Sequence, residues 1–202
     1  IGASVLLLAV ASGQASAGAP FCALRDPSHQ IYELYPEATG FRSVVRDIND
    51  ETKLAVDKQT PFPLHNGELG QHTLYVPVDG ERPLGYIQIR SELTEWGLAE
   101  IVWALNTEMR IVDFRFQRCR GAVCQNVMNK GLQALLRNKN KVALIEMVDS
   151  AGLLVTEHAG SMSLDERRLA GVVIRSAVKV IAVIELGWTT TVEEPHKYHA
   201  GL

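Results

Sequence analysis

Two cysteines separated by four residues, Cys119 and Cys124, are the first candidates for chemistry in this sequence. In an oxidising compartment the pair could form a disulfide, which would leave Cys22 as the odd cysteine. Arg118 and Arg120 flank Cys119, and neighbouring cations lower the pKa of a thiol. A catalytic thiol also needs a base or a resolving motif, and neither is recognisable. The pair is therefore a candidate disulfide, with a thiol-redox function as the lesser alternative.

Motifs for other chemistries are missing. The six histidines include no His-x-x-x-His pair, so no metal site is predicted. No Gly-x-Ser-x-Gly sequence, glycine-rich phosphate loop or dinucleotide fingerprint is present. Three acids close in sequence flank turns, where carboxylates usually face solvent, so we expect no paired acid and base: Glu92, Glu95 and Glu100. Apart from the thiol-redox alternative, any redox chemistry would therefore come from a bound cofactor.

The cysteines follow three strand patterns in series between Leu84 and Gly121. In the first, isoleucines alternate with Gln88 and Arg90, and in the third, apolar residues alternate with polar ones. The middle pattern, residues 102–105, is apolar throughout. We therefore expect an antiparallel meander whose middle strand is buried on both faces, while each neighbour keeps one polar face.

Flanking segments predict the remaining elements. Strands are expected at 41–48 and 73–78, and helices from Asp26-Pro27, from Asp50 to Lys58 and from Val123 to about Arg137. The type of segment 142–148 stays open. Ser163 and Glu166 form a capping box that opens a long amphipathic helix ending near Gly187. The predicted fold class is α+β, a mainly antiparallel sheet packed with flanking helices.

The first seventeen residues carry no charge, and Ala15-Ser16-Ala17 is typical of a signal-peptide cleavage site. The alternative is a buried N-terminal helix or a retained anchor. We predict a signal peptide at 1–17, a single domain at 18–188 and a C-terminal tail at 189–202, in a secreted or periplasmic protein. A net charge of −3 gives no indication of a nucleic-acid partner.

The stretch 84–121 resembles the FMN-binding domain. The resemblance rests on the Gly85-Tyr86 pair, the Trp96-Gly97 break, the pattern Gly-x-x-x-Ile-x-x-x-Leu-Asn and the pattern Ile-Val-x-Phe-x-Phe. That family includes periplasmic subunits of sodium-pumping NADH:quinone reductases and of Rnf-type electron-transport complexes. The resemblance implies a flavin, and with it a redox partner protein or a membrane electron-transport complex.

Both flavin motifs of that family are degenerate in this sequence. The first, His-x-Glu-Thr-Pro-Gly, corresponds to 116–121, where only Gly121 is kept. The second, Ser-Gly-Ala-Thr-x-Ser-x-Ala-Val, corresponds to 170–178 and keeps Gly171, Ala177 and Val178. The threonine that carries FMN through a phosphoester corresponds to Val173. Because valine has no hydroxyl group, the resemblance implies non-covalent binding.

If FMN binds, its phosphate needs donors, and guanidinium groups match phosphate oxygens. The candidates are Arg115, Arg118, Arg120 and Arg175, with the helix start near Ser163 as a second phosphate site. The alternative is that these arginines are a solvated rim. Trp96, beside Gly97, is a candidate to stack on the ring and Tyr86 to line its edge, whereas Trp103 is expected in the core.

The sequence thus predicts an exported protein that binds FMN non-covalently and acts in electron transfer. The candidate cofactor-binding residues are Tyr86, Trp96, Gly97, Arg118, Arg120, Gly121, Gly171 and Arg175. The competing hypothesis is a domain that has lost flavin and serves as a protein-interaction or assembly module.

Overall fold

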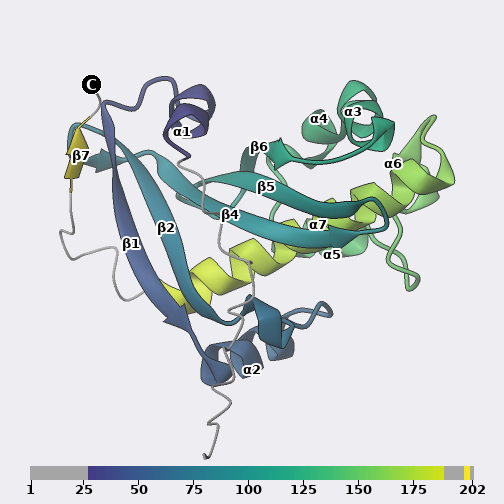
Figure 1. Cartoon of the computed structure of the whole chain (residues 1–202), viewed down its shortest axis with the longest axis horizontal. Coiled ribbons are helices and arrows are strands. Elements are labelled where there is room, and N and C mark those ends of the chain that lie inside the picture. Colours follow the sequence, from purple (N-terminus) through teal and green to yellow (C-terminus); the bar gives the residue numbers. More distant parts are fainter. Residues whose placement is uncertain (1–26, 189–197, 201–202) are drawn as a thin grey trace, which may run out of the picture.

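The computed structural model describes residues 27–188 and the backbone of 198–200. The predicted signal peptide at 1–17, Cys22 and the rest of the tail lie outside the described residues. The described residues form one mainly antiparallel sheet with helices on both faces (Figure 1). The predicted α+β class with a meander sheet is confirmed.

The described strands follow the order β6-β5-β4-β2-β1-β7, and every pairing is antiparallel. The meander comprises β4, β5 and β6, and β6 lies at one end of that order. The short β3 pairs with β2 beside this path. The strands are β1 (Gly40–Ile48), β2 (Gly70–Asp79), β3 (Arg82–Pro83), β4 (Gly85–Thr94), β5 (Gly97–Asn106), β6 (Ile111–Arg118) and β7 (Tyr198–Ala200).

Helices cover the two faces unequally. The long helix α7 packs against β4, β5 and β1, while α1 lies on the opposite face (Figure 1). Most of the core therefore lies between the sheet and α7. The helices are α1 (Ser28–Leu34), α2 (Asp50–Gln59), the 3-10 turn η1 (Asn66–Glu68), α3 (Ala122–Asn129), α4 (Leu132–Leu136), α5 (Lys141–Glu146), α6 (Thr156–Ala159) and α7 (Leu164–Gly187).

Strand β5 is buried on both faces, as the sequence predicts. Trp103 faces the α7 side, where its indole Nε1 donates to Ser176 Oγ at 3.1 Å, and Val102 faces the α1 side. The prediction for β4 is wrong, because it keeps no polar solvent-facing side over most of its length. Gln88 and Arg90 are only 1% and 3% exposed. Charged side chains from α7 and η1 take the place of water there.

Local signals explain the helix boundaries. The capping box at α7 is formed, with Ser163 Oγ accepting from Glu166 N and the Glu166 carboxylate accepting from Ser163 N. The single helix expected from Val123 to Arg137 is instead divided into α3 and α4. Gly131 lies between them at φ +81°, a left-handed conformation that ends a helix. The undecided segment 142–148 contributes most of α5.

Candidate functional site

A groove of about 630 Å³ runs between the edge strand β6 and the helices α3 and α4. Its volume lies within the range of roughly 300–1,000 Å³ that is typical of small-molecule sites. We call it the β6–α3 groove. It is lined by Arg115, Phe116, Gln117, Arg118, Cys119, Cys124, Gln125, Met128, Asn129 and Gln133.

The chain closes the far end of this groove with a covalent link. After β6 ends at Arg118, Gly121 takes φ +87° and serves as the N-cap of α3. A disulfide joins Cys119 to Cys124 across this turn, with their Cα atoms 6.1 Å apart. The end of β6 and the first turn of α3 are therefore held together, which fixes the width of the groove at this point.

Phe116, Cys119 and Met128 give the groove an apolar floor, since each is partly exposed and packs against the main core. Arg118 lies beside them and forms no ion pair with any residue of 27–188, not even with Glu100, its cross-strand neighbour on β5. An arginine without a carboxylate partner is available to an anionic ligand.

The amide side chains of the groove differ in whether they already form hydrogen bonds within the protein. Gln133 donates to Asp113 and to the Phe114 carbonyl, and Gln125 donates to Asn129 at 2.9 Å. Gln117 Oε1, in contrast, is buried with no hydrogen-bond partner in the described part of the chain. A ligand that donates a hydrogen bond at this position would satisfy it.

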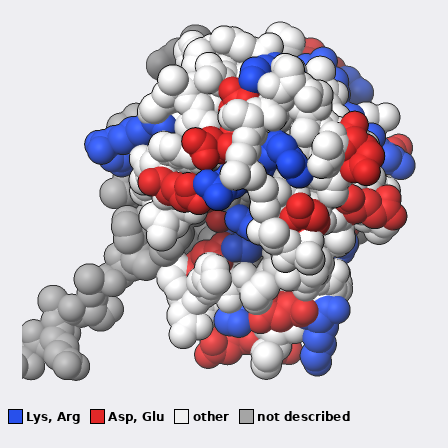
Figure 2. Space-filling view, turned by 90° about the vertical axis from the view of Figure 1, so that its right-hand side faces the viewer, with Lys and Arg blue, Asp and Glu red and all other residues white. Residues whose placement is uncertain are grey.

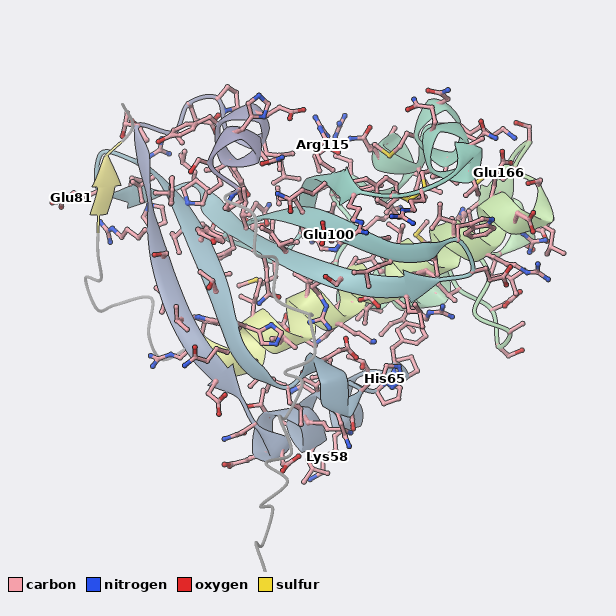
Figure 3. The ribbon with its side chains drawn as sticks, viewed as in Figure 1. Lys58, His65, Glu81, Glu100, Arg115 and Glu166 are labelled. Atoms are coloured by element: carbon pink, nitrogen blue, oxygen red, sulfur yellow. A yellow bond between two sulfur atoms is a disulfide. The ribbon has the colours of Figure 1, made fainter. Side chains whose placement is uncertain are left out.

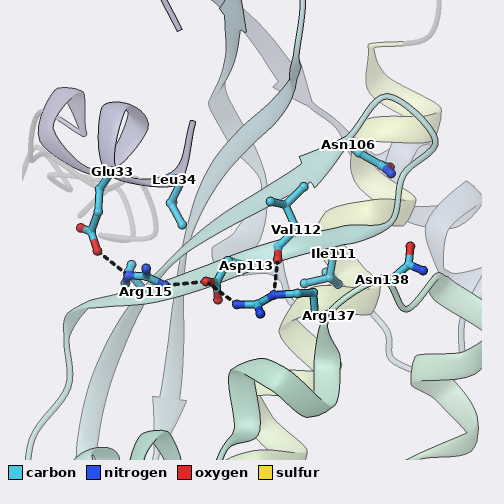
Figure 4. A pocket seen from close by; sticks show the side chains of 9 residues that line it. All are labelled: Glu33, Leu34, Asn106, Ile111, Val112, Asp113, Arg115, Arg137 and Asn138. Carbon is cyan, nitrogen blue, oxygen red and sulfur yellow. Dashed lines mark hydrogen bonds and ion pairs between the residues drawn. The ribbon is translucent and has the colours of Figure 1, made fainter. Parts of the chain in front are cut away.

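Arg115, at the other end of the groove, is fully engaged. It forms ion pairs with Glu33 of α1 at 2.6 Å and with Asp113 at 2.9 Å, and Asp113 also accepts from Arg137 at 3.2 Å (Figure 4). Burial acts to lower the pKa of Arg115, but these hydrogen bonds raise it on balance. Figure 3 shows Arg115 between α1 and the α3–α4 pair. Arg115 links α1 to β6, and Asp113 extends this link to Arg137 at the end of α4.

The same chain of ion pairs crosses a second hollow of about 420 Å³ on the other side of Arg115 (Figure 4). Its two arginines are matched by two acids, so its charge is balanced internally. This leaves less attraction for an anion than in the β6–α3 groove, where Arg118 has no such partner.

A third hollow of about 250 Å³ contains two of the predicted flavin residues, Trp96 and Arg175. Arg175 Nη1 donates to the Gly152 carbonyl at 3.3 Å, and the adjacent Arg168 pairs with Glu95 at 3.6 Å. The volume is below the usual range for small-molecule sites. Trp96 also lies near Gly121, so this hollow adjoins the turn that follows β6.

The predicted flavin residues do not surround one cavity. Tyr86 is buried near the start of β4, and Thr94 is eight residues farther along, about 26 Å at roughly 3.3 Å per residue. Tyr86 therefore cannot line a site that contains Trp96. Among the predicted arginines, Arg118 lines the groove and Arg120 is exposed beside it.

The glycines singled out by the family resemblance have structural roles. Gly97, at φ +106°, follows the turn between β4 and β5. Gly171 lies against the loop before α6, where an added Cβ would collide with the Gly152 carbonyl. Val173, which corresponds to the flavin-carrying threonine, is fully buried in the core. No ligand could be attached at that position without unpacking α7.

The start of α7, the second phosphate site suggested by the sequence, is already occupied by its own chain. The Glu166 carboxylate accepts from Lys130 at 2.6 Å and from Ser163 N at 2.5 Å (Figure 3 labels Glu166). These hydrogen bonds, led by the one from Lys130, hold the pKa of Glu166 below its usual value. A carboxylate thus fills the place that a phosphate would take.

Sequence reasoning missed a buried cluster of charges between β4, η1 and α7. Glu68 accepts from Arg90 and, at 3.1 Å, from Lys179, and Glu92 lies 3.5 Å from Arg90 Nε. We call these four residues the Glu68 cluster. A lysine within the apolar sequence of α7 and the Arg90-x-Glu92 spacing on one strand face were the available signals. The prediction that Glu92 faces solvent is wrong, because it is only 12% exposed.

The described residues contain no group of three or more His, Cys, Asp or Glu placed to hold a metal ion. Within the same residues, no helix is both long and apolar enough to cross a membrane. Figure 2 shows cations and anions interspersed over one face, with no broad area of a single sign. Of the three hollows described above, the β6–α3 groove has the largest volume and an arginine without an ion pair in residues 27–188, so it is the candidate binding site.

Comparison with protein-family models, with curated proteins and with solved structures gives no match for this chain.

Proposed function

We propose that this chain is an exported binding protein for FMN, held without a covalent bond in the β6–α3 groove, and that it serves in electron transfer. The single observation that carries the proposal is Arg118, a partly exposed arginine without an ion-pair partner in the described chain, beside an apolar floor. A groove with an apolar floor and one guanidinium free of ion pairs suits a ligand with an aromatic body and an anionic end.

The residues present fit the two parts of FMN. Phe116 and Met128 offer aromatic and thioether surface to a planar ring, and both are partly exposed. Arg118, with exposed Arg120 near it, supplies donors for the phosphate, which carries close to two negative charges. Bound flavin would supply the electron transfer, while these residues position it.

Export and a redox partner complete the proposal. The disulfide between Cys119 and Cys124 suits an oxidising compartment, in agreement with the expected signal peptide. The partner would be a redox protein or a membrane electron-transport complex, as the family resemblance implies. Arg120 lies at the open rim of the groove, where a partner would approach a bound ligand.

A second candidate is a domain that has lost flavin and acts as a protein-interaction or assembly module. The observation that favours it is the buried Val173, together with the separation of Tyr86 from Trp96. In this case the glycine that each motif keeps has a structural role alone: Gly171 allows close packing, and Gly121 allows the turn after β6.

Titration of the purified protein with FMN, followed by flavin fluorescence and by absorbance after desalting, distinguishes the two. We expect saturable binding, weakened about tenfold or more in Arg118→Ala, because a hydrogen bond to a charged group contributes about 1.5–3 kcal/mol. Arg82→Ala is the matched control, since Arg82 lies on β3 and its one ion pair within residues 27–188 is with exposed Asp79. No binding by the unmodified protein would leave the assembly module as the surviving candidate.

A further inference from the structure

The disulfide of the β6–α3 groove lies at the boundary between the core and the surface. Cys119 is partly exposed, whereas Cys124 is 7% exposed, and both line the groove. An incoming thiol can therefore reach the sulfur of Cys119, while Cys124 stays sheltered. This asymmetry defines which sulfur is attacked and which one leaves.

The leaving sulfur lies at the positive end of a helix. Cys124 is the third residue of the eight-residue α3, and the first turn of this helix has neither an acidic residue nor a side-chain cap. The helices α2 and α7, in contrast, carry both. A thiolate formed at Cys124 is thus stabilised by the helix dipole without competition from a carboxylate.

One contact and the local charge also favour the reduced pair. Cys124 Sγ lies 3.0 Å from the Arg120 carbonyl, which can accept a hydrogen bond from the thiol once Cys124 is protonated. Arg118 and Arg120 are the sequence neighbours of Cys119, and they add positive charge to this end of the groove, which favours a thiolate. Stabilisation of the reduced form makes a disulfide easier to reduce.

We propose that Cys119 and Cys124 form a thiol–disulfide exchange site whose substrates are dithiols presented in the groove by a protein or a small molecule. The substrate thiolate attacks Cys119 Sγ, and the electron pair of the S–S bond passes to Cys124 Sγ, which takes up a proton. The second substrate thiol then loses its proton and attacks the substrate sulfur of the mixed disulfide, which releases Cys119 as a thiolate that takes up a proton. The substrate leaves as a disulfide, and the protein holds two thiols.

The test is the rate at which dithiothreitol reduces this disulfide, measured in a Cys22→Ser background so that one pair of thiols is counted. We expect the folded protein to react at least tenfold faster than the same chain unfolded in urea. A disulfide with only a structural role is protected by folding and reacts more slowly in the folded state. A folded protein that reacts less than tenfold faster than the unfolded chain would overturn the proposal.

A matched pair of substitutions tests the part played by α3. Ala122, the first residue of the helix, is exposed, so its side chain can be changed without disturbing the core. Ala122→Glu should slow the reduction about threefold, as expected for a charge at a helix terminus, and Ala122→Lys should not slow it. Equal rates for the two variants would refute the role of the helix. The assay needs no flavin, so its result is independent of the FMN titration.

Discussion

Replacing Glu68 by glutamine removes the carboxylate on which two buried cations depend. Glu68 is 2% exposed, and it accepts from Arg90 and from Lys179 Nζ at 3.1 and 3.2 Å. With Glu92 as the second acid, the Glu68 cluster is electrically balanced. Glu68→Gln leaves it with one excess positive charge in a site that water does not reach.

The expected loss of stability is large. Breaking a buried ion pair by removing one partner costs about 3–5 kcal/mol, because the remaining charge stays buried and unpaired. Domains of this size are stable by only about 5–15 kcal/mol. With a denaturant dependence of roughly 2 kcal/mol/M, the urea midpoint should fall by about 2 M.

The pH dependence tests the electrostatic origin of the loss. Burial acts to raise the pKa of Glu68, but the charges of Arg90 and Lys179 hold it below its ordinary value. The stability that Glu68 contributes is therefore complete above about pH 4.3 and disappears as the pH falls through the lowered pKa. The difference between the two proteins should shrink from pH 6 to pH 3.

His72 also lowers the stability of both the unmodified protein and the Glu68→Gln variant at acid pH. Its pKa is lowered by burial and by Arg90, so stability falls as the pH drops below about 6.5. For this reason the measured quantity is the difference in unfolding free energy between the variant and the unmodified protein at each pH. Equilibrium urea unfolding, followed by circular dichroism, provides it.

Two further variants make this experiment decisive. Glu157→Gln, on the exposed surface of α6, should change stability by no more than about 0.5 kcal/mol. Lys179→Met combined with Glu68→Gln restores charge balance. The loss of unfolding free energy in the double variant should therefore be smaller, by about 1–3 kcal/mol, than the sum of the losses in the two single variants. A loss below 1 kcal/mol for Glu68→Gln, or strict additivity, would refute the reasoning.

Two other predictions concern packing around α7. Gly171→Ala should destabilise the protein by about 1–3 kcal/mol, because the added methyl group would collide with the Gly152 carbonyl. Gly187→Ala in the same helix is the control, because its methyl group would meet only Ile48 Cδ1 at 3.4 Å and should not destabilise the protein. Thermal unfolding compares the two variants. Ser176→Ala should cost about 1–3 kcal/mol in urea unfolding, because the Trp103 indole N–H loses its acceptor in the core, and an unchanged midpoint would contradict this.

The sequence alone was sufficient wherever the signal is local. The capping box of Ser163 and Glu166 begins α7, and the apolar run 102–105 predicts a strand covered on both faces. Both features depend on residues close together in the chain, so no distant contact was needed to interpret them. Gly131 is the exception, because the expected helix from Val123 to Arg137 ignored its left-handed conformation, which divides α3 from α4.

Only the tertiary structure decided which polar side chains face inward and which residues share a cavity. Alternation along β4 places Gln88 and Arg90 on one face. Whether that face meets water or protein depends on α7, whose Lys179 lies nearly ninety residues later in the chain and shares Glu68 with Arg90. In the same way, Arg118 and residues of α3 line one groove, while Tyr86 and Trp96 lie far apart. Burial and site geometry are set by long-range packing, and no local pattern encodes them.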